Sequence, residues 1–253
     1  MYLIQVGFIE MGEYLKWQKK QEEMFAKDSV IEEVLASPVQ RERVDVAVSM
    51  IGSGGTVLDI GCGDAAIGEL MRKNGNTVVG LDFPAVIRTA TEKKEISLVA
   101  GEASNLPFAN ESFTAIFAGE IIEHLLNVTK FLGDIHRILK KDGKLVVTTP
   151  NITRLRNRLS LLLGDVSPWH EWDKDFSHIR YWTPQTLLDC LSKNGFRPET
   201  VGWGRSLGGG FDWTIFSEEE QRILNQILNR FTSEPRPFFL ESFIIVMARR
   251  LEK

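Results

Sequence analysis

Two carboxylates and one imidazole fall within five consecutive residues, at Glu120, Glu123 and His124. They follow an apolar run, residues 113–118, that predicts a strand, so we expect them at the strand's carboxyl end. Carboxylate oxygens and an imidazole nitrogen are suitable ligands for Mg²⁺, Mn²⁺ or Zn²⁺. An imidazole also has the unperturbed pKa of a general base near neutral pH. Metal binding and proton transfer are therefore two chemistries open to this stretch.

A glycine-rich turn follows another predicted strand, residues 56–60. Gly61 and Gly63 provide backbone freedom at a tight turn and let the main chain approach a ligand closely. Asp82 ends the next apolar run, and a carboxylate at that place suits the two hydroxyls of a ribose. The sequence therefore predicts a nucleoside site at the ends of these two strands.

The turn resembles motif I of the class I S-adenosylmethionine-dependent methyltransferases, D-x-G-x-G-x-(G/A), here Asp59, Gly61, Gly63 and Ala65. The resemblance covers most of the chain, from about Gly55 to the C-terminus. It implies S-adenosylmethionine as cofactor and S-adenosylhomocysteine as product. The cofactor-binding residues that it implies are Asp59, Gly61, Cys62, Gly63, Asp82, Phe83, Glu102, Ala103 and Glu120.

A second motif concerns the adenine. The loop 101–108 is similar to the family's G-D-A-x-x-L-P-F loop, whose acidic residue binds the adenine amino group. Glu102 stands at that position and has a longer side chain than the usual Asp. Phe83 is a candidate wall of the adenine slot, and Glu120 is a candidate contact of the methionine end.

The stretch that begins at Glu120 has the pattern E-x-x-E-H, which resembles two subgroups of the family. These are the O-methyltransferases of ubiquinone biosynthesis and the small-RNA 2′-O-methyltransferases, in which such residues bind a divalent metal with a later His. The resemblance implies the metal ligands Glu120, Glu123, His124 and His178, with His170 as the alternative to His178. Without metal, it implies a catalytic set of His124 as base with Glu123 and His178. Two interpretations stay open beside these: Glu120 contacts only the cofactor, or His124 is structural.

A polar, aromatic segment, residues 164–182, is the main candidate for acceptor binding. Its aromatic side chains could line the binding site of a flat or apolar acceptor, and they are Trp169, Trp172, Tyr181 and Trp182. The alternative is that they close the open end of the sheet, since residues 181–184 resemble a structural segment of the family. The resemblance implies a small-molecule acceptor, with a hydroxyl oxygen as the methylated atom.

Strand and helix patterns alternate along the chain, which predicts right-handed crossovers and a parallel sheet. The fold class we expect is α/β: a Rossmann-like, seven-stranded, mostly parallel sheet with an antiparallel C-terminal strand, helices on both faces and extra N-terminal helices. The predicted strands are 56–60, 77–81, 96–100, 113–118, 145–149, 196–203 and 239–248. The predicted helices are 39–51, 65–73, one from 84, 128–140, 152–163, 184–191 and 217–231.

We expect two parts in the chain. Residues 1–54 would form an N-terminal helical extension or cap, and residues 55–253 would form the methyltransferase domain. Acceptor-side insertions are expected at 152–182 and 204–237.

Composition limits the function further. The chain has 253 residues, of which 43% are hydrophobic, enough for one large α/β domain. A net charge of -4 does not favour nucleic acid as a partner. Two cysteines make no disulfide framework, so we expect a reducing, cytoplasmic setting. We expect no signal peptide, because Glu10 and Glu13 stand where one would be apolar, and no membrane span, because the apolar runs are short.

Two other classes of protein fit part of the pattern. An NAD-dependent oxidoreductase is one, because residues 61–66 also match G-x-G-x-x-A. Asp59 before the glycines and the Glu102 loop favour the methyltransferase instead. A non-catalytic S-adenosylmethionine-binding module is the other, and the intact stretch 120–124 argues against it.

Overall fold

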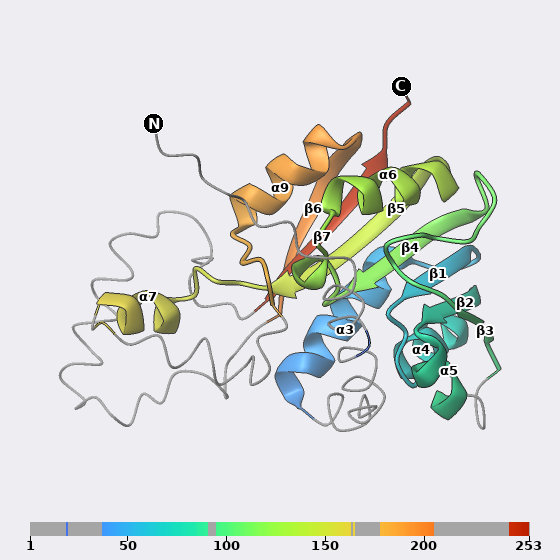
Figure 1. Ribbon diagram of the computed structural model, residues 1–253, viewed down its shortest axis with the longest axis horizontal. Coiled ribbons are helices and arrows are strands. Elements are labelled where there is room, and N and C mark those ends of the chain that lie inside the picture. The colour runs from blue at the N-terminus through green and yellow to red at the C-terminus, as the bar shows by residue number, and fades with distance from the viewer. Residues whose placement is uncertain are drawn as a thin grey trace.

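A computed structural model of the chain describes Lys19 and residues 37–90, 95–162, 164, 178–204 and 243–252. Its strands are β1 (Thr56–Ile60), β2 (Thr77–Asp82), β3 (Ser97–Ala100), β4 (Phe113–Gly119), β5 (Leu139–Pro150), β6 (Phe196–Gly204) and β7 (Phe243–Arg250). They form one seven-stranded sheet in the order β3-β2-β1-β4-β5-β7-β6 (Figure 1). The first five strands of that order pair in parallel, and β7 pairs antiparallel with β5 and β6. The predicted fold class is confirmed.

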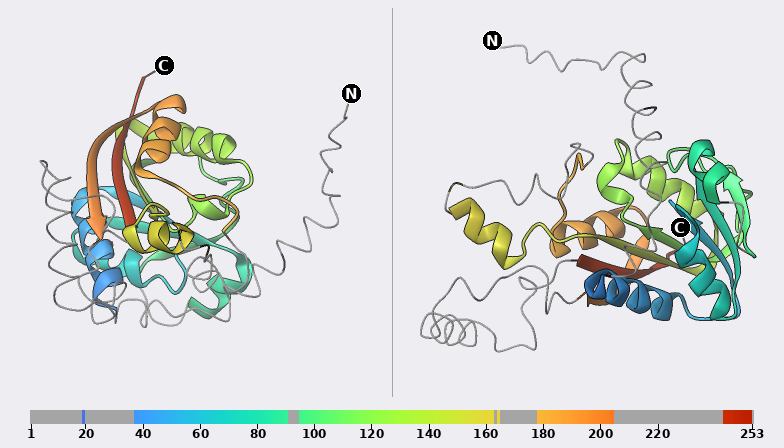
Figure 2. Two further views of the ribbon diagram at one scale, coloured as in Figure 1. Left: turned by 90° about the vertical axis from the view of Figure 1, so that its left-hand side faces the viewer. Right: turned by 90° about the horizontal axis from the view of Figure 1, so that it is seen from below.

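Helices cover both faces of this sheet. They are α3 (Pro38–Ile51), α4 (Ala66–Lys73), α5 (Pro84–Ala90), the short 3₁₀ helix η1 (Ile122–His124), α6 (Val128–Ile138), α7 (Leu155–Leu162) and α9 (Pro184–Lys193). Helices α6 and α9 pack in one core cluster, and α3 and α4 pack in a second cluster on the opposite face (Figures 1 and 2). Helix α7 stands apart from the sheet in the same views.

Local sequence explains where helices α6 and α9 start. The Asn127 side chain accepts a hydrogen bond from the Lys130 N–H at 3.0 Å and so caps α6. Thr183 and Thr186 form a capping box at the start of α9, and Pro184 occupies the first turn, where no N–H is needed. Both helices then bury an apolar face against the sheet.

The predicted helix 128–140 is wrong at its end, because α6 stops at Ile138. Leu139 is instead the first residue of β5, where it is buried and pairs with Phe113 of β4. Sheet pairing and burial outweigh helix propensity there. The strand expected at 145–149 is accordingly longer at both ends.

Other boundaries differ by smaller amounts. Helix α7 begins at Leu155 rather than at 152, because the Asn151 side chain accepts hydrogen bonds from the Thr153 N–H and hydroxyl and holds a turn. Of the strand predicted at 239–248, the residues that the structure describes, 243–248, lie in β7. The predicted helix 217–231 lies outside the described residues.

Within the described part of the chain, no helix combines the length and the apolar character needed to cross a bilayer.

Candidate active site

The glycine turn lies at the carboxyl end of β1. Gly61 and Gly63 have φ values of 73° and 53°, in the left-handed region that glycine adopts without cost. The Gly61 N–H donates to the Leu81 carbonyl at 2.8 Å, which holds the turn against β2. A Cβ atom added at Gly61 would lie 2.2 Å from Cδ1 of Ile121. The positive φ therefore favours glycine here, and a larger residue would also displace the Ile121 side chain.

Asp82 organises the same turn from the end of β2. One of its oxygens accepts from the Gly63 N–H at 2.8 Å, and the other accepts from the Phe83 N–H at 2.7 Å. Burial raises the pKa of Asp82, while these two N–H groups oppose that rise. Each carboxylate oxygen has a second lone pair, so both keep capacity for a further donor such as a ribose hydroxyl.

Asp59 lies beneath the turn and is 1% exposed. Among the described residues, its Oδ2 atom has no hydrogen-bond partner. Burial raises its pKa to about 8, and the nearby charge of Asp82 adds to the rise. The carboxyl is therefore mainly protonated at neutral pH.

Cys62, in the turn itself, is also buried. Burial raises the pKa of its thiol, so the residue contributes its backbone and its volume rather than a nucleophile.

The predicted adenine loop follows β3 and begins beside Asp82. The Gly101 N–H donates to the Asp82 carbonyl at 2.9 Å. The Glu102 carboxylate is exposed and accepts from the Ser104 hydroxyl at 2.9 Å. Ala103 is half-buried against the core. The loop and Asp82 thus share one end of the sheet.

Glu120 follows β4 in a left-handed conformation, with φ of 56°. Its Oε1 accepts from the Thr148 hydroxyl at 2.8 Å and lies 3.2 Å from the Arg43 guanidinium. Arg43 comes from α3, is 4% exposed, and packs its guanidinium over the Phe243 ring at 5.2 Å. The Glu120 carboxylate is therefore held in a partly buried ion pair.

Glu123 in η1 is 1% exposed. Its Oε2 accepts from the Thr149 hydroxyl at 2.9 Å, whereas its Oε1 has no hydrogen-bond partner among the described residues. Burial, reinforced by the charge of Glu120, raises the pKa of Glu123 well above its ordinary value. A buried carboxyl with one unpartnered oxygen is typical of a site that receives a proton or a ligand.

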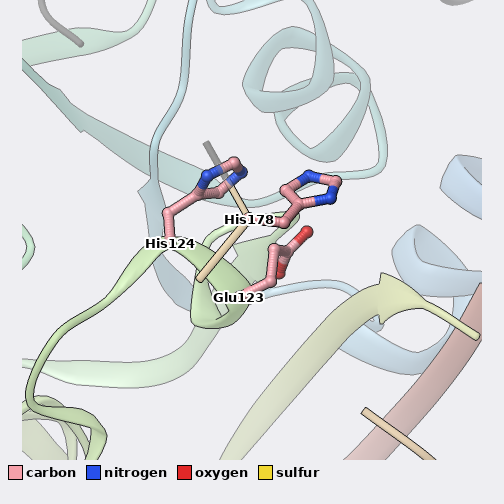
Figure 3. Close-up of side chains that lie close together, drawn as sticks. All are labelled: Glu123, His124 and His178. Carbon is pink, nitrogen blue, oxygen red and sulfur yellow. The ribbon is translucent and has the colours of Figure 1, made fainter. Parts of the chain in front are cut away.

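His124 and His178 complete this group (Figure 3). Their rings lie 4.7 Å apart between centroids, at 60° to each other. One ligand atom from each of Glu123, His124 and His178 lies within 4.8 Å of the others. The fold brings His178 there through the backbone, since the Ile179 and Arg180 N–H groups both donate to the Glu123 carbonyl, at 3.1 and 3.2 Å.

Three of the four predicted metal ligands thus lie together, and Glu120 does not join them. Its carboxylate is engaged by Arg43 and Thr148 instead. Of the predicted aromatic wall, Tyr181 is exposed and Trp182 is buried in the core cluster. The remaining aromatic candidates, Trp169 and Trp172, and the alternative ligand His170 lie outside the described residues.

Three residues of this site were not predicted from the sequence: Arg43, Thr148 and Thr149. The two threonines end the apolar run of β5, beside β4, and polar residues at such a strand end are a signal that could have identified them. Arg43 carries no comparable local signal, because its helix has a second arginine, Arg41, and its burial depends on packing against the sheet.

Comparison with known proteins gives one family. The family model described as a methyltransferase domain matches residues 31–201. The mitochondrial ubiquinone biosynthesis O-methyltransferase of Bos taurus is 28% identical over 165 residues, 59% of this chain and 43% of that protein. The ubiquinone biosynthesis O-methyltransferase of Brucella anthropi is 28% identical over 184 residues, 64% of this chain and 72% of that protein. The chain spans less than half the length of the bovine relative.

Solved structures share the fold. A SAM-dependent methyltransferase from Archaeoglobus fulgidus aligns with a TM-score of 0.61 at 21% identity, over 85% of this chain and 95% of that one. The 1,6-didemethyltoxoflavin-N1-methyltransferase of Burkholderia thailandensis, bound to S-adenosylhomocysteine, aligns with a TM-score of 0.63 at 15% identity. That alignment covers 98% of this chain and 94% of the other.

Proposed function

The chain belongs to the methyltransferase domain family, and from that premise we propose that it transfers a methyl group from S-adenosylmethionine to a hydroxyl oxygen of a small-molecule acceptor. The observation that supports the hydroxyl acceptor is the group formed by Glu123, His124 and His178 at the end of β4. An imidazole at that place can take the proton that a hydroxyl must lose. The named O-methyltransferase relatives agree with this choice.

The residues present fit the cofactor. The left-handed glycines of the turn leave its main chain without side chains of its own, and Asp82 keeps acceptor capacity for ribose hydroxyls. At the methionine end, the partly exposed carboxylate of Glu120 suits the cofactor's ammonium, and Arg43 and Thr148 hold that carboxylate in place. Bound S-adenosylmethionine would supply an electrophilic methyl group on its sulfonium.

The protein's part in the reaction is then to hold the acceptor and move one proton. His124 accepts the hydroxyl proton as the oxygen attacks, and its neighbour His178 helps to hold the acceptor. Glu123 is buried next to both imidazole rings, and the Thr149 hydroxyl holds its carboxyl in place (Figure 3). Burial, reinforced by the nearby charge of Glu120, raises the pKa of this carboxyl.

We also propose that the same three side chains can hold a divalent metal, and that in the metal-bound form His124 is a ligand and not the base. One carboxylate and two imidazoles are a common donor set for Zn²⁺ and also suit Mn²⁺, and the unpartnered Oε1 of Glu123 supplies a ligand atom. A metal there would act as a Lewis acid toward an acceptor with two neighbouring hydroxyls, such as a diol, a catechol or a ribose. The ion pair of Glu120 with Arg43 argues for three protein ligands rather than four.

The first experiment is calorimetric titration of S-adenosylhomocysteine into metal-stripped protein, followed by Mg²⁺, Mn²⁺ and Zn²⁺ into that complex. We expect cofactor binding and one saturable metal site, which Glu123→Ala abolishes while S-adenosylhomocysteine still binds. Cofactor binding without a metal response would contradict the metal and leave His124 as the base. Binding of NADH without S-adenosylhomocysteine would overturn the proposed function.

The second experiment tests His124 itself. Release of S-adenosylhomocysteine is measured over a panel of diols and catechols, with and without metal. We expect His124→Ala to lower turnover by about 10²–10⁴-fold with cofactor affinity unchanged. Lys141→Ala, which breaks an exposed ion pair with Glu252, is the matched control and keeps full turnover. Unchanged turnover in His124→Ala would exclude both roles of this residue.

The remaining alternatives have direct readouts. Methylated product from any acceptor excludes a non-catalytic binding module. The cytoplasmic setting stays a prediction, to which the structure adds that Cys62 and Cys190 are both free thiols.

A further inference from the structure

One face of α6 is turned toward the adenine loop rather than the core. The Arg137 guanidinium donates to the carbonyls of Phe108 and Leu106, at 2.6 and 3.1 Å, and to the Asn110 side chain at 3.1 Å. One side chain thus fixes two points in the second half of this loop and one point just after it. Charged donors to backbone carbonyls are stronger than neutral ones, so this contact defines the loop's path.

Lys130 fixes the first half of the loop from one end of the same helix. Its ammonium donates to the Ser104 carbonyl. The Ser104 hydroxyl in turn donates to Oε2 of Glu102 at 2.9 Å. A continuous chain of contacts therefore runs from α6 to the carboxylate that is predicted to recognise adenine.

Asp134 joins the two cations. Its carboxylate lies 3.0 Å from Lys130 and 3.5 Å from Arg137, so the three residues form one network at helical spacing. The opposite face of the helix is fixed, since Phe131, Leu132 and neighbouring residues are fully buried in the core. A rigid helix thus carries the polar network to the loop.

We propose that Lys130, Asp134 and Arg137 are positioning residues that set the selectivity of the cofactor site for adenine. Lys130 and Arg137 touch the loop backbone, and Asp134 holds these two cations in place. None of the three touches the cofactor, and they act by placing Glu102. Because Glu102 as an adenine contact is part of the proposed function, the inference rests on it. Helix α6, which does not touch the cofactor, would then determine how well the site distinguishes one purine from another.

The test compares two probes, S-adenosylhomocysteine and S-inosylhomocysteine, which carries a carbonyl in place of the adenine amino group. Calorimetry gives both dissociation constants and their ratio. We expect the wild-type protein to prefer the adenosine compound and Arg137→Ala to lose about tenfold in that preference, as befits the loss of about one net charged hydrogen bond. We expect turnover at saturating S-adenosylmethionine to be unchanged and the KM for it to rise, which a general loss of stability would not produce.

Matched variants separate a loss of loop positioning from a general loss of folded structure. Arg249→Ala is the control, because Arg249 also ties a carboxylate and a backbone carbonyl and is similarly exposed, but its partners, Glu199 and Asp142, lie outside the adenine loop. It should keep the wild-type ratio. Lys130→Met should lower the ratio too, and Arg137→Lys should recover part of it.

A double-mutant cycle tests the coupling. If the network acts through Glu102, then Arg137→Ala has little further effect on the ratio in a Glu102→Ala background. A wild-type ratio in folded Arg137→Ala and Lys130→Met proteins would overturn the inference, and so would independent effects in the cycle. Failure of the wild-type protein to bind S-adenosylhomocysteine would instead overturn the proposed function, so the two failures are distinguishable.

Discussion

At the scale of single residues, two buried carboxyls have similar environments. Asp59 and Glu123 each have one oxygen without a hydrogen-bond partner in the described part of the chain, and burial raises the pKa of both. Asp82 differs, because each of its oxygens accepts a backbone N–H. The site therefore combines two buried carboxyls, each with one oxygen unpartnered among the described residues, with Asp82, whose two oxygens are both held by backbone N–H groups.

The pKa of Asp59 predicts how stability depends on pH. A carboxyl with a folded-state pKa of about 8 and an unfolded value of 3.8 binds its proton more tightly in the folded state. The free energy of unfolding therefore falls as pH rises between these values, by at most about 1.4 kcal/mol per pH unit from this group. Denaturant titrations from pH 5 to pH 9 should show the fall in the wild-type protein.

Asp59→Asn is the matched variant, because its amide is neutral at every pH and has nearly the same shape. It should flatten the pH dependence and exceed the wild-type stability above pH 8. An equal slope in both proteins would mean that Asp59 is already ionised in the folded state.

At the scale of elements, α4 begins with an unusual residue. Its N-cap is Ala65, which has φ of 66° and is completely buried. A left-handed conformation costs a residue other than glycine about 1–2 kcal/mol. This geometry explains why the motif position allows glycine or alanine, since both avoid a larger side chain at a strained cap.

Two substitutions at Ala65 should separate strain from packing. Glycine relieves the strain but loses a buried methyl and gains unfolded-state entropy, so Ala65→Gly should stay within about 1 kcal/mol of the wild-type stability. Ala65→Val adds branching at a positive φ and should cost more than about 2 kcal/mol. Thermal and denaturant unfolding measure both. A tolerated valine would contradict the left-handed cap.

At the scale of the whole molecule, the last strand of the sequence lies inside the sheet. Strand β7 pairs with β5 on one side and β6 on the other, and most of its residues are buried. Strand β3 lies at the opposite edge, has four residues and is only partly buried. Strand β7 is therefore an internal, mostly buried strand, whereas β3 is a partly exposed edge strand.

Hydrogen exchange should reveal this order. We expect amides of β3 to exchange at least about tenfold faster than those of β7, because edge residues open locally while central ones open with the global transition. Peptides from β1, which is also internal, are the reference and should resemble β7. Equal protection of β3 and β7 would show that the sheet opens only as one unit.

The sequence alone determined the parts of the protein that depend on local pattern. Strand β1, the turn at Gly61 and the helix after it follow from an apolar run, glycines and a helix-forming segment, all contiguous along the chain. The adjacent Glu123 and His124 were likewise identifiable as one chemical unit. Local pattern suffices there because the interacting groups are neighbours along the chain.

Only the tertiary structure decided which distant groups meet. Parallel pairing places Gly119 beside Thr148, and Arg43 reaches Glu120 from a helix that has no motif. Backbone hydrogen bonds to Glu123 bring His178 to the site across a long segment of sequence. These contacts depend on strand order and on burial, which a one-dimensional pattern of residue types does not contain. The end of α6 at Ile138 has the same cause, since the next residue gains more by joining the sheet than by extending the helix.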